Sequence, residues 1–174
     1  ERSGGQNINW NYADPSNLTQ IYWDNPYFIR NKNFQSDERN RFIGYSKLDY
    51  KIADWLTATA KISTDSYSEL REERRAFGSI AGAFGINRLD EKSGYQKYQR
   101  SFSEQNYDFI LTFKKDISES ISFSGVAGGT AVRTRIISTL NSTQGGLIVP
   151  DLYSLSNSVQ QVPFPLEAEA NQGI

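Results

Sequence analysis

The sequence predicts an all-β protein of long antiparallel strands, with the features of a segment of a transmembrane β-barrel. Apolar and polar side chains alternate with a period of two along four stretches of the chain, which is typical of strands that present two different faces. Tight turns join these stretches in pairs, whereas long polar segments separate the pairs. Aromatic residues make up 13% of the chain, and aromatic side chains favour strands.

Residues 1–39 predict a long folded loop on the extracellular side. Asp-Pro and Asn-Pro pairs, which favour turns, interrupt the segment. Its several aromatic residues argue against disorder, because disordered segments contain few of them. Such side chains can contact a ligand or a protein partner, or they can simply hold the loop together. The candidates for these contacts are Trp10, Trp23, Tyr27 and Phe28.

Residues 40–67 predict a β-hairpin with a tight turn at Ala53–Trp55. One face is apolar or small from Phe42 to Ile52, and again after the turn, while the other face is polar and charged. This pattern fits a sheet that lies on a protein core, and it equally fits a barrel wall with lipid outside and water inside. In a barrel, the lumen-facing candidates are Lys47, Asp49, Lys61 and Asp65.

Residues 68–98 predict a second long extracellular loop, and residues 99–135 a second hairpin with a polar turn around Asp116–Ser120. The loop begins with a densely charged stretch at Glu69–Arg75. This stretch could be one turn of helix or a strand that continues beyond a membrane. Residues 136–174 predict a third extracellular loop and the start of a further strand.

The distribution of loop lengths favours the barrel. Both tight turns fall on one side of the predicted sheet, and all long loops fall on the other. Soluble sandwiches mix loop lengths at both ends, whereas outer-membrane barrels have short periplasmic turns and long extracellular loops. The predicted strands, at ~10–14 residues, also reach the ~9–11 residues that a tilted strand needs to cross a bilayer.

Four strands are too few for a closed barrel, because the smallest known barrels have about eight. An open sheet in lipid would leave backbone groups at its edges without partners. We therefore expect this chain to be part of a larger barrel domain. No apolar run approaches the ~20 residues of a membrane-spanning helix.

Composition excludes several kinds of site. The 19 basic and 20 acidic residues nearly balance, which argues against nucleic-acid binding. The chain has no Cys and no His, so a zinc finger, a thiol nucleophile or a Ser-His-Asp triad cannot be built from it. The adjacent pair Glu72-Glu73 lies among arginines and predicts a solvated, salt-bridged segment. We expect no catalytic, metal or cofactor site, and no enzyme.

Five segments follow one another in a specific order. They are DNPYFIRNKN, ERNRFIGYSKLDYKIADWLTATAKISTDSY, LREERRAFGS, NYDFILTFKKDISESISFSGVAGG and GGLIVPDLYSLSNS. Together they resemble the SusC-like (SusC/RagA) family of TonB-linked outer-membrane transporters. The resemblance covers roughly Asn25 to Ser158. It rests on the order and spacing of soft patterns, because none of the segments is a catalytic signature.

The resemblance implies a barrel of about 22 strands filled by an N-terminal plug, in the outer membrane of a Gram-negative bacterium. It also implies a SusD-like surface lipoprotein as a lid, and energy delivered through the plug by TonB. Substrates of the family are oligosaccharides or oligopeptides too large for porins. This chain would be a multi-pass part of the wall, in contact with outer-membrane lipid, and we expect the plug to lie outside this sequence.

A soluble β-sandwich that binds carbohydrate is the alternative from a different class of protein. The apolar strand faces would then pack against each other, and the aromatic loops would form a platform for sugar rings. The two hypotheses predict different surroundings for Phe42, Leu48, Tyr107 and Phe109. These side chains face lipid in the barrel and a protein core in the sandwich.

Overall fold

The computed structural model describes residues 7–8 and 10–173 of the chain. It is 66% strand and 6% helix, and its sheet is mostly antiparallel. The all-β class expected from the alternating pattern is therefore confirmed. Within the described residues, no helix has the length and apolar character needed to cross a membrane.

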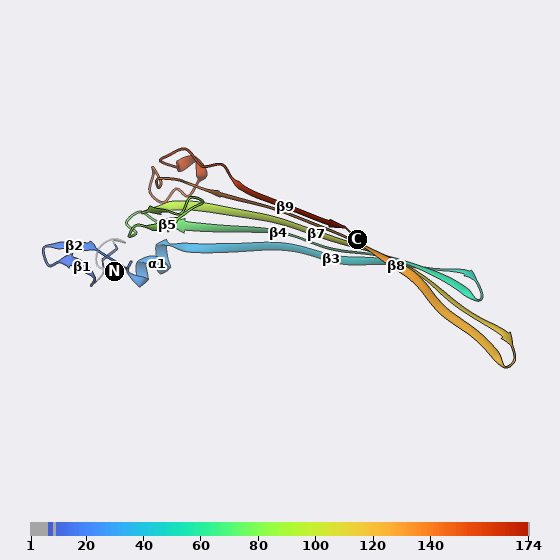
Figure 1. The fold of residues 1–174 in the computed structure, drawn as a ribbon. Helices are drawn as coiled ribbons and strands as arrows, with labels where there is room; N and C mark the ends of the chain where they lie inside the picture. The colour runs from blue at the N-terminus through green and yellow to red at the C-terminus, as the bar shows by residue number, and fades with distance from the viewer. Residues whose placement is uncertain (1–6, 9, 174) are drawn as a thin grey trace. The chain divides into compact units, whose positions relative to one another are not determined.

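The main sheet has five strands, which lie side by side in the order β3-β4-β7-β8-β9 (Figure 1). Asp54 and Trp55 form the turn between the first two strands, and Glu119 and Ser120 form the turn between the next two. The bounds are β3 Phe34–Ala53, β4 Leu56–Arg75, β7 Gly94–Ser118, β8 Ile121–Ser142 and β9 Leu166–Gly173.

The strands run further than the stretches of alternating polarity. The charged stretch at Glu69–Arg75 continues strand β4 and forms no helical turn. Its side chains make polar contacts across the sheet, as Gln96 Nε2 on β7 does when it donates to Glu73 Oε2 at 3.4 Å. Strand pairing therefore persists where apolar alternation stops, because the backbone ladder does not require apolar side chains.

The chain divides into two units. The loop unit comprises Glu1–Glu38, Glu69–Arg100 and Ser138–Glu167, and the hairpin unit comprises Arg39–Ser68, Ser101–Ile137 and Ala168–Ile174. Every buried side chain that the structure describes belongs to the loop unit. Its buried apolar residues are Phe28, Ala76, Phe84, Tyr95 and Leu147.

Residues 1–39 contain more regular structure than the sequence predicts. Helix α1 (Pro26–Lys32) begins at Pro26, which suits the first turn of a helix. The side chain of Asn25 caps it by accepting from Tyr27 N at 2.9 Å. The remaining short elements are β1 Tyr12–Asp14, β2 Asn17–Gln20, β5 Gly82–Phe84, β6 Leu89–Glu91 and the 3-10 helix η1 Leu155–Asn157.

Two adjacent glycines of β8 provide a test of strand packing. A Cβ atom at Gly128 would lie 2.5 Å from the backbone oxygen of Phe109, whereas one at Gly129 would have no atom within 4 Å. Backbone cannot rotate away as a side chain can. We expect Gly128→Ala to lower the free energy of unfolding by about 1–3 kcal/mol and Gly129→Ala to leave it nearly unchanged. Urea unfolding of both variants measures this, and equal stabilities would contradict the strand packing.

Candidate functional site

A chain of polar contacts joins β3 and β4 in the hairpin unit. Arg41 donates to both carboxylate oxygens of Asp65, at 2.8 Å and 2.5 Å. Asp49 pairs with Lys47 at 2.9 Å and accepts from Thr59 at 2.5 Å. These contacts place the side chains on one face of the sheet, since residues two apart on a strand share a face. We call this the polar face.

The polar face continues across the next two strands of the hairpin unit. Tyr67 on β4 stacks on Phe102 on β7, with 4.9 Å between ring centroids. Thr130 on β8 donates to Asp108 on β7 at 2.8 Å. Side-chain contacts on the polar face thus extend over four strands of the sheet.

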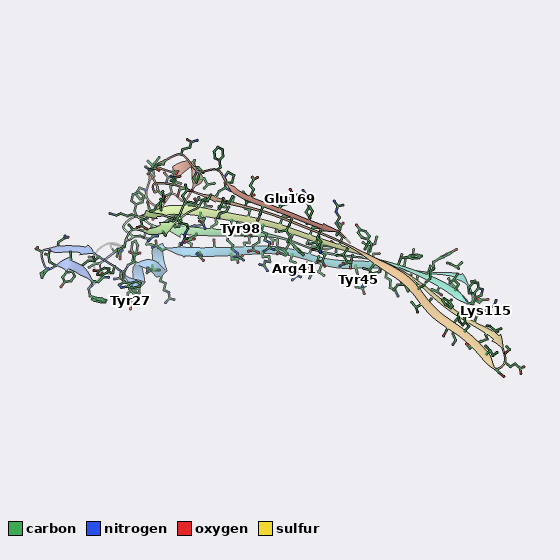
Figure 2. The ribbon with its side chains drawn as sticks, in the orientation of Figure 1. Tyr27, Arg41, Tyr45, Tyr98, Lys115 and Glu169 are labelled. Atoms are coloured by element: carbon green, nitrogen blue, oxygen red, sulfur yellow. The ribbon has the colours of Figure 1, made fainter. Side chains whose placement is uncertain are left out.

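All four lumen-facing candidates take part in the polar face. The ammonium of Lys61 lies 5.5 Å from the ring centroid of Tyr45, and the other three candidates make the ion pairs described above. Figure 2 shows Arg41 and Tyr45 on the same side of β3. The sequence pattern identifies the charged candidates but not these partners, because the pairing of two strands depends on their register.

The opposite face of the hairpin unit is apolar. Phe113 on β7 lies against Phe123 on β8, with ring centroids 5.3 Å apart. Phe42, Leu48 and Tyr50 of β3 are 64%, 66% and 65% exposed. We call this the apolar face. Its large side chains are Phe42, Leu48, Tyr50, Ile52, Leu56, Ile62, Tyr107, Phe109, Leu111, Phe113, Ile117, Ile121 and Phe123.

No described residue of the hairpin unit covers the apolar face. None of the unit's described residues is buried, so its sheet has no apolar core of its own. Monomeric soluble proteins rarely expose a continuous apolar patch larger than a few hundred Å². The apolar face is therefore larger and more exposed than is usual for a soluble monomer.

The apolar face extends over about ten residues of the long strands β3, β7 and β8. On β8 the apolar or small side chains run from Ile121 to Ala131 in steps of two. Ten residue steps span about 33 Å along a strand, and a tilt of about 40° reduces this to about 25 Å, which is the height of the apolar band on membrane barrels. Toward the turn end, the ammonium of Lys115 lies 5.6 Å from the ring centroid of Trp55, and Figure 2 labels Lys115.

The loop unit contains a polar hollow of about 460 Å³. Arg71 is one of its lining residues and lies 3.2 Å from Asp37, and it is also ion-paired with the buried Glu69. The guanidinium also lies 5.8 Å from the ring centroid of Tyr98, which is labelled in Figure 2. The hollow is lined by Gln35, Ser36, Asp37, Arg71, Glu72, Glu73, Gln96, Tyr98 and Leu140. Carboxylates, amides and one aromatic ring can together hold a ligand rich in hydroxyl or amide groups.

A hydrogen bond from Tyr95 to Glu72 lies beside this hollow. Burial and, next in size, the bond to Glu72 together raise the pKa of Tyr95 to about 12. The same bond is the main cause that lowers the pKa of Glu72, and Arg74 at 3.3 Å adds to it. A neutral tyrosine and an ionised glutamate are thus both favoured in the folded state.

Buried polar side chains hold the loops of the loop unit together. Glu91, which is 6% exposed, accepts from Gly145 N at 2.8 Å and from Gly146 N at 3.1 Å. Both glycines have positive φ angles, 74° and 94°, which disfavour other residues. Asn33 Oδ1 accepts from Ala76 N at 2.7 Å. These contacts are specific enough to order the loops.

Three of the four aromatic loop candidates are exposed. Trp10, Trp23 and Tyr27 are 82%, 70% and 72% exposed, whereas Phe28 is 7% exposed. Phe28 therefore belongs to the core of the loop unit, and its side chain is not placed to contact a ligand. The sequence could not make this distinction, because the orientation of α1 decides which of its aromatic residues is buried.

No protein-family model and no curated protein sequence matches the chain. In the part of the chain that the structure describes, no three acidic, Cys or His side chains gather closely enough to hold a metal ion.

We predict that Glu91→Ala loosens the turn at Gly145 and Gly146. The variant leaves two backbone N–H groups without their acceptor, which costs about 1–3 kcal/mol. Amide hydrogen exchange at residues 145–147 should then be about tenfold faster or more, given the same range. Glu119→Ala, at the exposed turn between β7 and β8, is the matched control and should change nothing there. Unchanged exchange in Glu91→Ala would show that the carboxylate does not hold the turn.

We also predict a pH dependence that belongs to Tyr95. Because its pKa is raised, the stability that it contributes is fully present below its ordinary pKa of 10.0 and is lost as the pH rises through about 12. The difference in absorbance near 295 nm between the wild type and Tyr95→Phe should follow this titration. Glu72→Gln should lower the midpoint, because it replaces a charged acceptor, which favours the neutral phenol, by an uncharged one. A midpoint at the ordinary value would refute the burial of this phenol.

Proposed function

We propose that the chain is a segment of the barrel wall of a SusC-like, TonB-linked outer-membrane transporter. Such a protein imports oligosaccharides or oligopeptides together with a SusD-like surface lipoprotein. The observation that carries the proposal is the hairpin unit, in which one sheet has an apolar face and a polar face and no described residue is buried. Lipid outside and water inside a barrel satisfy both faces at once.

The two outer edges of the main sheet support the proposal that the chain belongs to a larger closed barrel wall. β3 and β9 are the outer strands of the main sheet, so each has one edge that no other strand of this sheet pairs. An edge in a bilayer must be paired, because lipid offers no hydrogen bonds to backbone groups. In the proposal, further strands of the same barrel pair with β3 and β9.

The proposed mechanism is gated passage without covalent chemistry. The polar face, with its ion pairs between Arg41 and Asp65 and between Lys47 and Asp49, would line the barrel interior and contact the plug or the solute. TonB would then remodel the plug and open the path. Half-exposed ion pairs of this kind contribute only about 0–1 kcal/mol each to stability, which favours a role at a wet surface.

Substrate capture would take place at the loops. The hollow around Arg71 and Tyr98 combines carboxylates, amides and a ring, which suits either hydroxyl groups of sugars or amides of peptides. The contacts of Glu91 and Asn33 order the loops before a substrate arrives, and this lowers the entropic cost of binding. The exposed Trp10 and Trp23 offer surface to the lid lipoprotein or to the substrate.

Two adjacent residues of β4 test the proposal directly. Ile62 lies on the apolar face, and Ser63 lies on the polar face. The sequence contains no cysteine, so a spin label on Ile62→Cys or Ser63→Cys is unique in it. In bilayers, we expect the label at 62 to be accessible to oxygen dissolved in lipid and the label at 63 to a water-soluble nickel complex. Equal access of the nickel complex to both labels would disprove the barrel wall, and it would be the result for a soluble sheet.

The same two positions predict opposite effects of an introduced charge. Ile62→Arg should destabilise the folded protein in bilayers by about 2–4 kcal/mol, because it places a guanidinium in hydrocarbon. Ser63→Arg should cost much less, because water reaches the polar face. Urea unfolding from lipid vesicles measures both values. A larger loss in Ser63→Arg would reverse the assignment of the two faces.

A further inference from the structure

Two arginines border the apolar face at its end away from the tight turns. Arg133 and Arg135 follow Ala131 on β8 in steps of two, so all three share a face. A hollow of about 320 Å³ lies in front of the two arginines. Its lining is polar except for one residue and consists of Ser101, Ser103, Gln105, Arg133, Arg135 and Ile137.

The hollow carries a net positive charge. Arg135 Nη2 lies 3.2 Å from Glu169 Oε1 on β9, and Asn171 Nδ2 also donates to that oxygen, at 3.0 Å. This contact fixes Arg135 and neutralises one charge (Figure 2 shows Glu169). Among the described residues, no carboxylate lies within ion-pair distance of Arg133. Two guanidinium groups and one carboxylate leave a net charge of +1.

The donors around the hollow match a phosphate group. Each guanidinium presents several N–H groups in a planar fork, which suits the oxygens of phosphate and binds them more strongly than neutral donors do. The hydroxyls of Ser101 and Ser103 and the amide of Gln105 are further donors on the neighbouring strand. An uncharged ligand would offer no opposite charge to the guanidinium of Arg133.

The position of the hollow indicates where the phosphate comes from. The apolar side chains of β8 end at Ala131, one step before Arg133, so the arginines lie at the depth of lipid headgroups if the apolar face lies in hydrocarbon. Basic residues at this depth attract anionic headgroups. Small residues precede the hollow on the same face of β8, and a Cβ atom at Gly129 would meet nothing within 4 Å. This leaves room for an acyl chain alongside.

We propose that Arg133 and Arg135, with the serines and Gln105 beside them, bind the phosphorylated headgroup of a lipid in the outer leaflet. Arg133 binds the phosphate with its uncompensated charge, and Arg135 is held in place by Glu169. The lipid's acyl chain lies on the small residues of β8. The inference rests on the proposed function, because it requires the apolar face to lie in a bilayer.

The test compares lipids that differ only in phosphate. Purified protein in detergent with phosphatidylcholine is titrated with diphosphorylated lipid A and with its dephosphorylated form, and native mass spectrometry counts the bound lipid. We expect a preference for the phosphorylated form. The double variant Arg133→Gln/Arg135→Gln should bind it about tenfold more weakly or worse, as expected for the loss of charge-assisted hydrogen bonds.

Lys115→Gln is the matched control. It removes a cation from the same face at the opposite, turn end of β7, so it should leave the preference unchanged. Inorganic phosphate is the second control for the source of the ligand. If millimolar inorganic phosphate abolished the lipid preference, the site would be one for soluble phosphate and the proposal would be wrong.

The label at Ile62→Cys separates this inference from the proposed function. If the label at 62 lies in lipid but the protein shows no preference for phosphorylated lipid, the headgroup site is wrong and the proposed barrel wall is unaffected. If the double variant keeps the preference for phosphorylated lipid, the headgroup site is wrong as well. A label that is not in lipid would overturn both proposals.

Discussion

The hairpin unit depends on one constraint, which is that a sheet without a covering layer cannot keep large apolar side chains in water. Domains normally bury the apolar face of a sheet against a second layer. Here Phe42, Leu48 and Tyr50 are each about two-thirds exposed, and none of the unit's described residues is buried. The partner of the apolar face must come from its surroundings, and the polar face must be hydrated. In the proposed barrel wall, lipid and water on opposite sides meet both needs, and the tight turn, the loops and the proposed headgroup site fit this arrangement.

The loop unit has a different requirement. Its long connections contain many backbone N–H and C=O groups that need hydrogen-bond partners. Buried polar side chains supply them. Glu91 accepts from two backbone N–H groups, and Asn157 donates to the carbonyls of Val149 and Leu152 at 2.8 Å and 2.7 Å. The loops thus have a small core of their own with Phe28, Phe84 and Tyr95. A recognition surface on ordered loops requires less ordering when it binds a ligand.

Much of the sheet could be predicted from the sequence, because alternation with a period of two reveals strands and their faces directly. The turn at Asp54 and Trp55 lies where the change of pattern indicates it. The strand extension through Glu69–Arg75 could not be assigned, since charged residues have no apolar period there. The sequence also does not predict that Phe28 is buried and Tyr27 exposed. Both residues lie in a short helix, and the packing of the loops sets the orientation of that helix.

The sequence by itself determined which residues share a face of each strand, because that depends only on the geometry of one strand. It also determined the absence of cysteine and histidine chemistry. Only the tertiary structure decided which strands are neighbours and in what register, and therefore that Arg41 meets Asp65 and that Glu91 reaches Gly145 and Gly146. It also placed Arg133 and Arg135 beside the serines of β7. Contacts between residues far apart in the chain depend on pairing and packing, which no local pattern encodes.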